Sequence, residues 1–395
     1  MMDDKEKMVP RIRFRGFGDA WEQRKLNDFL IESQIKGSNG STSQKLTVKL
    51  WGKGIVPKVN NWKKGSENTK YYIRHAGQLM YGKLDFLHGA FGIVPKSLDG
   101  FESTIDSPAF DISKKINSSF LLYLVMQRKF YIKQGSIANG SRKAKRVHEN
   151  TFLDMSIQLP KVEEQGKIGQ LLGTIDNLIV ANEKKGQQLK GLKRLLMEKL
   201  FSQVWRFRGF SDPWEQRKFA ELYKKVTQKN DLTYSSNQII SVATMSWKKA
   251  NHVSSESYMK SYNIMKLGDI AFEGNKSKDF SFGRFVENTI GNGIVSHVFD
   301  VFRPIQKGNI SFWKYLIHDE QIMRKKLARS TTSSTMMTNL VAKDFLRQKI
   351  YIPQIGEQDQ IGALIESTDN LIVANEKKLD QLKQLKKYLM QNMFV

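Results

Sequence analysis

The sequence predicts an α+β fold with two mixed α/β domains, related by a pseudo-two-fold and separated by two long antiparallel coiled-coil helices. The string DNLIVANEKK occupies residues 176–185 and again residues 369–378, an offset of 193 (369 − 176). At the same offset, RFRGFGDAWEQRK at 13–25 recurs as RFRGFSDPWEQRK at 206–218. The sequences between these matched segments differ. A repeated frame around divergent segments indicates one architecture that presents two different surfaces.

The domain boundaries follow from this duplication. A chain of 395 residues suits two or three domains. We expect the first domain at residues 1–160, the first spacer helix at 161–204, the second domain at 205–353 and the second spacer helix at 354–395.

The first long helix is expected from about residue 163 to residue 202, because no proline interrupts this stretch and apolar residues recur at helical spacing. Pro160 lies just before it, and Glu163 and Glu164 in its first turn complement the helix dipole. About 40 residues give a helix of roughly 60 Å. A helix of that length needs a partner helix, which the second copy supplies after Pro353.

Heptad spacing predicts where the two helices meet. One asparagine interrupts the leucines of each helix, and we interpret it as a register or partner-contact position, with simple exposure to solvent as the alternative. The expected seam and partner-contact residues are Leu178, Asn182, Leu189, Leu192, Leu196, Leu371, Asn375, Leu382, Leu385 and Leu389.

Both intervening domains contain short β-like runs between Gly, Asn and Pro, together with aromatic helical stretches. Expected strands are 71–73, 79–81, 91–94, 238–242, 269–272 and 294–302, and expected helices are 119–131 and 311–327. The order of elements is similar in the two copies. We take the GIV segments that begin at Gly92 and Gly293 as equivalent strands.

The composition favours a soluble protein with a polyanionic partner. Hydrophobic residues make up 40% and aromatic residues 11%, enough for globular cores, and 64 basic against 39 acidic residues give a net charge of +25. Nucleic acid is the first candidate partner, ahead of an anionic membrane or an acidic protein. There is no Cys, no secretory signal and no apolar run near ~20 residues, so we expect a cytoplasmic protein without a membrane partner.

Basic residues interleaved with Gly and aromatic residues indicate phosphate and base contacts. A solvated basic surface is the alternative for any one of these side chains. The candidate DNA-binding residues are Lys63, Lys64, Arg142, Lys143, Lys145, Arg146, Lys248, Lys249, Lys276, Lys278 and Arg284.

The sequence contains no motif for a reactive centre. A Walker phosphate loop is absent, and no Pro-Pro dipeptide exists, which excludes the Asn-Pro-Pro-aromatic motif of amino-methyltransferases. The six histidines lack metal-ligand spacing, so we expect no metal site and no catalytic residue. The chain therefore offers surfaces for recognition.

At this point the whole chain resembles a specificity subunit of a type I restriction–modification system. The resemblance is carried by the FRGF-x-D-x-WEQRK segments at 14–25 and 207–218, the Gly268-Asp269-Ile270 turn and strand, the GIV strands and the duplicated NLIVANEKK helices. The first copy departs from the Gly-Asp-Ile form, with Gly77-Gln78-Leu79.

The resemblance implies that each domain is a target recognition domain that reads one half of a split, asymmetric site in double-stranded DNA. The helices would form the spacer and dock two methyltransferase subunits, and two restriction subunits would join them. S-adenosylmethionine, ATP and Mg²⁺ would belong to those partners, with no cofactor in this non-catalytic chain. The alternatives are a stand-alone sequence-specific DNA-binding protein and an enzyme with an unrecognised site.

Overall fold

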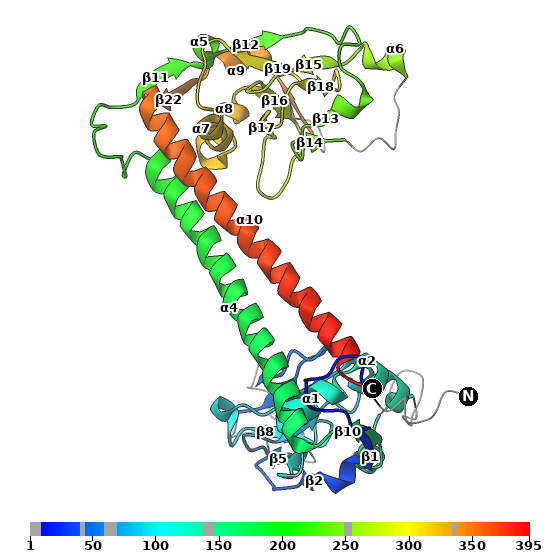
Figure 1. Ribbon diagram of the computed structural model, residues 1–395. Coiled ribbons are helices and arrows are strands. Elements are labelled where there is room, and N and C mark those ends of the chain that lie inside the picture. The colour runs from blue at the N-terminus through cyan, green and yellow to red at the C-terminus, as the bar shows by residue number, and fades with distance from the viewer. Residues whose placement is uncertain (1–8, 40–43, 59–68, 137–145, 249–254, 334–336) are drawn as a thin grey trace. The chain divides into compact units, whose positions relative to one another are not determined.

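The computed structural model describes residues 9–39, 44–58, 69–136, 146–248, 255–333 and 337–395 (Figure 1). The chain divides into two compact units. Unit 1 comprises Met1–Glu183 and Lys377–Val395, and unit 2 comprises Lys184–Glu376. Within the described ranges, no helix is both long and apolar enough to cross a membrane.

Unit 1 is built around an antiparallel sheet that, in the described residues, has four strands in the order β2-β9-β6-β7. These strands are β2 (Leu30–Ser33), β9 (Ala109–Ile112), β6 (Leu79–Tyr81) and β7 (Phe91–Ile93). Smaller strand pairs are β1 (Glu22–Lys25) with β10 (Ser156–Leu159), β3 (Leu46–Val48) with β4 (Ile55–Pro57), and β5 (Tyr71–Ile73) with β8 (Glu102–Thr104). The short helices are α1 (Ser118–Val125), α2 (Arg128–Gly135) and α3 (Glu149–Leu153).

Unit 2 repeats this plan, with the sheet order β12-β19-β16-β17 in its described residues. These strands are β12 (Tyr223–Val226), β19 (Val301–Pro304), β16 (Ile270–Glu273) and β17 (Arg284–Glu287). The strand pairs are β11 (Glu215–Lys218) with β22 (Lys349–Ile352), β13 (Ile240–Ser241) with β14 (Ser246–Trp247), β15 (Asn263–Met265) with β18 (Gly293–Val295), and β20 (Thr331–Ser333) with β21 (Thr338–Leu340). The short helices are α5 (Phe219–Leu222), α6 (Glu256–Met259), α7 (Ile310–Leu316), α8 (Glu320–Ala328) and α9 (Ala342–Arg347).

The long helices are α4 (Val162–Phe201) and α10 (Ile355–Asn392), so the expected fold class of mixed α/β domains with two long helices is confirmed. In unit 1, Lys386 of α10 lies 2.6 Å from Asp176 of α4, and Lys383 lies 2.8 Å from Glu183. From the first ion pair to the second, the residue number rises from 176 to 183 on α4 and falls from 386 to 383 on α10. The paired segments therefore run antiparallel. The same holds in unit 2, where Lys193 pairs with Asp369 and Lys190 pairs with Glu376, each at 2.7 Å.

The buried stripe of the helices differs from the expected seam. Leu178, Leu192, Leu371 and Leu385 are exposed by 43%, 45%, 54% and 45%, so as seam residues they were wrong. Asn182, Asn375 and Leu196 are buried, and Leu189, Leu382 and Leu389 are half-buried. The physical reason is that two paired helices bury only a narrow stripe on each other. Residues such as Ile175 and Ile372 occupy that stripe, and the exposed leucines lie on its flank.

The two GIV segments are not equivalent, which corrects the expectation from sequence. The first belongs to β7 in the four-stranded sheet, whereas the second is β18, which pairs with β15. The counterpart of β7 is β17, because each is the last strand in the order of its four-stranded sheet and pairs with the equivalent strand, β6 or β16. The GIV segments lie 201 apart (293 − 92), whereas the repeat offset is 193. A three-residue apolar run suits any buried strand, so it does not specify its sheet.

Three expected elements are each divided in two. The helix expected at 119–131 is α1 and α2, and that expected at 311–327 is α7 and α8. Asp319 starts α8 as an N-cap, because its Oδ1 accepts a hydrogen bond from the Ile322 amide at 3.1 Å. The strand expected at 294–302 forms β18 and β19, which belong to different sheets. The turn between them is closed by the Phe299 amide, which donates to the Ser296 carbonyl.

The end of each long helix completes the core of a unit. Phe394 follows α10 and lies against Trp21 and Phe120 of unit 1, with ring centroids 6.2 and 5.4 Å away. Phe201 ends α4 and lies against Phe312 in unit 2 at 6.2 Å. Since 394 − 201 is again 193, the duplication includes the way the helix ends are buried.

Candidate functional site

The duplicated Asp of each DNLIVANEKK string joins three elements. In unit 1 the Tyr123 hydroxyl donates to Asp176 Oδ2 at 2.7 Å, and Lys386 Nζ reaches Asp176 Oδ1 at 2.6 Å. In unit 2, Tyr315, Asp369 and Lys193 repeat this arrangement with both distances at 2.7 Å. We call these two sets the Tyr–Asp–Lys triads. Each connects a domain helix, α1 or α7, to both long helices.

The pKa values of both triad tyrosines are raised. Burial, and secondarily the hydrogen bond to Asp176, raises the pKa of Tyr123 well above its usual value. The pKa of Tyr315 is raised for the same reasons, with Asp369 as the partner. Both phenols therefore stay protonated as hydrogen-bond donors, which indicates a structural role for the triads.

The first turn of each long helix anchors a duplicated arginine. The Arg13 guanidinium donates to both carboxylate oxygens of buried Glu164, at 2.9 and 2.7 Å, and Arg206 donates to Glu357 at 2.5 and 2.8 Å. These bidentate pairs fix the RFRGF segments to the helix starts. The two copies differ in one bond, because Trp214 Nε1 also donates to Glu357 at 3.1 Å. The equivalent Trp21 Nε1 has no hydrogen-bond partner in the described structure.

The departure at Gly77-Gln78-Leu79 has a structural explanation. Gly77 and Gly268 both have left-handed backbones, with φ of 89° and 83°. Asp269 accepts the Lys266 amide at 2.7 Å, and Gln78 accepts the His75 amide in the same way at 2.8 Å. Gln78 therefore fills the same backbone role as Asp269.

The partners of this shared position differ in charge. Asp269 binds Arg303 of β19 at 2.8 Å, whereas Gln78 donates to Asp111 of β9 at 2.9 Å. The backbone conformation at this position is thus the same in both units. The charged partner beside it is basic in unit 2 and acidic in unit 1.

In unit 2, the hairpin between β16 and β17 carries three of the basic residues expected to bind DNA. Arg284 binds Glu273 Oε2 at 2.7 Å and the Ala243 carbonyl at 2.8 Å, and only 22% of its side chain is exposed. Lys276 and Lys278 are exposed in the connecting loop. Arg284 therefore ties this hairpin to the turn between β13 and β14, and the two lysines are the residues presented to solvent.

The remaining candidates fall into two groups. Lys63, Lys64, Arg142, Lys143, Lys145 and Lys249 lie outside the described residues. Lys248 is exposed directly after β14, and Arg146 is 3.3 Å from Asp106. The described candidates therefore do not form one cluster, and their role in binding stays a prediction.

The sequence analysis missed the hairpin formed by β3 and β4. Residues 45–58 contain Lys45, Lys49, Lys53 and Lys58 and no acidic residue, with Trp51 at the turn. The sequence signal for this hairpin is a run of basic residues, without an acidic one, in and beside two short apolar strands.

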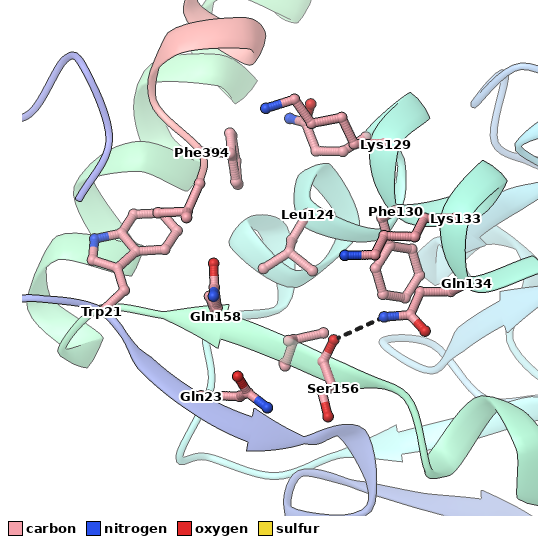
Figure 2. A pocket seen from close by; sticks show the side chains of 13 residues that line it. Trp21, Gln23, Leu124, Lys129, Phe130, Lys133, Gln134, Ser156, Gln158 and Phe394 are labelled. Carbon is pink, nitrogen blue, oxygen red and sulfur yellow. Dashed lines mark hydrogen bonds between the residues drawn. The ribbon is translucent and has the colours of Figure 1, made fainter. Parts of the chain in front are cut away.

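A cavity of about 440 Å³ in unit 1 lies between β1, β10, α1, α2 and the end of α10 (Figure 2). Trp21, Leu124 and Phe394 form one side of it, and Lys129 and Lys133 of α2 another. The Gln134 side chain donates to the Ser156 carbonyl at 3.3 Å. Among the side chains lining this cavity there is no Asp, Glu or His, so they provide no pair for acid–base chemistry.

A second cavity, of about 270 Å³, lies in unit 2 beside Arg284, Glu287, Lys314 and His318. Burial raises the pKa of Glu287 well above its usual range, while Lys314 opposes this shift. Burial, with help from Arg284, lowers the pKa of His318 to about 4. His318 is therefore neutral near pH 7, and Glu287 Oε2 has no hydrogen-bond partner in the described structure. In the parts of the chain that the structure describes, no group of three or more His, Asp or Glu is placed to hold a metal ion.

Comparison with known proteins places the chain near a family of DNA specificity proteins. Residues 211–384 match the family model of the type I restriction modification DNA specificity domain. The chain is also 24% identical over 311 residues to the type I restriction enzyme MjaVIII specificity subunit of Methanocaldococcus jannaschii, covering 70% of this chain and 69% of that one. Residues 211–384 of this chain therefore match a type I restriction modification DNA specificity domain, and the chain is similar to a specificity subunit over most of its length.

Solved structures share the fold of this chain. It is similar to the type I restriction–modification S subunit from M. genitalium, with a TM-score of 0.62, 12% identity, and coverage of 98% and 99% of the two chains. A chain from a structure of complex assembly and conformational transition in a type I system gives a TM-score of 0.51 at 14% identity, with the same coverage. The matched DNA specificity domain implies a role in DNA sequence recognition.

Proposed function

We propose that this chain is a specificity subunit that binds an asymmetric, bipartite site in double-stranded DNA. The domains at 1–160 and 205–353 would each read one half-site. The helices at 161–204 and 354–395 would act as spacer and as scaffold for two methyltransferase and two restriction subunits. One observation carries the proposal: the frame of the two units is duplicated residue by residue, while the side chains on equivalent strands differ.

The frame residues keep their identities at equivalent positions. Tyr, Asp and Lys recur in the triads, and the Arg–Glu pairs recur at the helix starts. On the sheet, by contrast, Ile93, which pairs with Leu79, stands where unit 2 has Glu287, which pairs with Ile270. Beside it, Gln78 stands where unit 2 has Asp269. Since base readout depends on side-chain chemistry, equal backbones with different side chains favour two different half-sites.

The long helices carry exposed apolar residues at duplicated positions. Leu178 and Leu371 are equivalent, as are Val180 and Val373, and all four are exposed. Exposed apolar residues that recur at equivalent positions of two repeats favour a protein interface. Two copies of the same surface suit two copies of one partner subunit, so Leu178, Leu192, Leu371 and Leu385 are retained as proposed partner contacts.

The subunit would contribute no catalysis of its own and would act in the cytoplasm. S-adenosylmethionine, ATP and Mg²⁺ would be held by the methyltransferase and restriction subunits. This division of labour is supported by the neutral His318 in the unit 2 cavity and by the acid-free side-chain lining of the unit 1 cavity.

Sequencing the methylated bases of a host with and without this gene tests the site. The expected result is one methylated motif that disappears with the gene and consists of two different half-sites separated by unspecified bases. A contiguous or palindromic motif would contradict the proposal.

Exchange of residues 26–159 for the matching segment of another specificity subunit tests the assignment of one half-site per domain. Only one half of the motif is expected to change, while the other half and the gap stay the same. Simultaneous change of both halves would contradict independent reading.

The second candidate is a stand-alone sequence-specific DNA-binding protein. The net charge of +25 favours DNA binding with or without partners. Purification from the native host decides between them, because methyltransferase subunits should accompany the chain only if it is a scaffold.

A further inference from the structure

The hairpin of β3 and β4 ends in an unusual turn. Val48 pairs with Ile55, and the Lys49 amide donates to the Gly54 carbonyl at 2.9 Å to close the hairpin. Trp51 has a φ of 59°, within the left-handed region. A bulky residue rarely adopts this conformation, and such outliers concentrate at functional sites.

The strained turn is held in place by the neighbouring hairpin of β6 and β7. The Trp51 amide donates to the His88 carbonyl at 2.8 Å, and the Gly52 amide donates to the Gly89 carbonyl at 2.9 Å. The His88 and Trp51 rings form a T-shaped pair, with centroids 5.5 Å apart. A side chain at residue 52 would collide with the terminal methyl of Met126, so the turn lies tightly against the unit.

In spite of this fixed backbone, the indole is not buried. Trp51 is 58% exposed, so most of the ring has no contact in the described structure. Glycine would adopt this positive φ without strain, and the exposed part of the Trp51 ring adds no packing to the unit. The conformation therefore needs a reason outside the fold.

The charge around the turn identifies the partner. Lys49, Lys53 and Lys58 are exposed, and none forms an ion pair within the described part of the chain. No acidic residue lies in 45–58. Cations beside an exposed aromatic ring suit nucleic acid, in which phosphates flank the bases.

We propose that the β3–β4 hairpin is a DNA-contacting element of unit 1. Lys49, Lys53 and Lys58 bind backbone phosphates, and the indole of Trp51 makes apolar contact with bases of the half-site. A two-stranded β-ribbon fits the major groove of B-DNA. The proposal rests on the proposed function and adds to it the hairpin that reads one half-site.

The test compares full-length variants on a selected duplex. Duplexes with randomised positions are selected on the wild type, and the best duplex is then used in competition binding. Trp51→Ala and Trp51→Gly are each expected to bind on the order of ten-fold more weakly. Trp51→Phe keeps a ring and should bind more tightly than either. Ile31→Ala, which removes an exposed apolar side chain of β2, is the matched control and should bind like the wild type.

Thermal unfolding separates contact from folding. Because glycine tolerates a positive φ, Trp51→Gly should melt at or above the wild-type temperature and yet bind DNA poorly. A fall in melting temperature that accounts for the loss of binding would overturn the proposal, since Trp51 would then be structural.

Salt dependence tests the lysines. Combined Lys49→Gln, Lys53→Gln and Lys58→Gln should flatten the slope of log K against log salt by roughly 3, one for each lost phosphate contact. An unchanged slope would overturn the phosphate contacts.

Different results would contradict the proposed function and the hairpin proposal. If the wild type selects no sequence at all, the proposed function fails. If the wild type selects a sequence and the Trp51 variants bind it equally well, only the hairpin proposal fails.

Discussion

Lys386 Nζ lies 2.6 Å from Oδ1 of Asp176, and the equivalent Lys193 lies 2.7 Å from Asp369. The lysine of each pair comes from the long helix opposite the one that carries the aspartate. Since each Asp also accepts a tyrosine hydroxyl from a domain helix, one side chain per unit fixes both the helix pairing and the position of the domain.

Asp176→Asn is expected to lower the free energy of unfolding by about 1 kcal/mol. The Asn side chain keeps an acceptor for Tyr123 but loses the charge that binds Lys386, and the partial exposure of the pair limits the effect. Urea unfolding of Asp176→Asn, Lys386→Gln and the double variant measures the coupling. Asp369→Asn should give a similar value, and strictly additive effects would contradict a direct pair.

Gly169→Ala should destabilise unit 1 by about 1–3 kcal/mol. A Cβ there would meet Asn117 Oδ1 at 2.8 Å and the Phe120 amide at 3.0 Å, where Asn117 caps α1. Gly166→Ala is the matched control on the same helix, because nothing lies within 4 Å of its Cβ. That variant should gain up to about 1 kcal/mol from helix propensity. Equal stability of the two variants, measured by denaturant unfolding, would contradict close packing at residue 169.

Glu357→Gln should cost more stability than Glu164→Gln. Both changes leave a partly exposed arginine without its carboxylate, which costs about 1–3 kcal/mol. Glu357 also accepts from Trp214 Nε1, whereas Trp21 Nε1 makes no such bond in the described structure. Chemical unfolding followed by tryptophan fluorescence measures both variants. A larger loss of stability for Glu164→Gln would show that the Trp214–Glu357 hydrogen bond contributes little to stability.

Glu287 should make stability fall as the pH rises. Burial raises its folded-state pKa above the usual 4.5, so its contribution is fully present below that pH and is lost as the pH rises toward the folded value. Glu287→Gln removes this dependence, so the variant should gain on the wild type from pH 4.5 upward. Urea midpoints across pH 4.5–8 provide the measurement.

His318 acts in the opposite direction. Its folded pKa of about 4 lies below the usual 6.5, so its contribution is lost as the pH falls from 6.5 toward 4. His318 is present in both the wild type and Glu287→Gln. The difference between their stability profiles therefore reports the contribution of Glu287 alone. Parallel pH profiles of the two proteins would contradict a raised pKa.

Sequence reasoning succeeded where the signal was local or exactly repeated. The helices α4 and α10 were predictable because proline-free periodicity is a property of consecutive residues. Strands such as β5 and β6 were found at their observed positions, since both are apolar runs between turn residues.

It failed where an element depends on distant neighbours. Leu178 follows the helical period and yet is exposed, because the stripe that a partner helix covers is narrow. The ion pair between Arg284 and Glu273 on the adjacent strand was not found from the sequence, and a role of Arg284 in DNA binding stays a prediction. The strained turn at Trp51 left no mark in the sequence beyond two nearby glycines.

By itself, the sequence determined that the protein is one unit made twice, with long helices and a basic surface, because identical strings at one offset require no knowledge of contacts. Only the tertiary structure decided that β7 corresponds to β17, that Gln78 takes the place of Asp269, and that Asp176 joins α1, α4 and α10. These relationships are made by residues tens to hundreds of positions apart, and their energies depend on distance and burial in space.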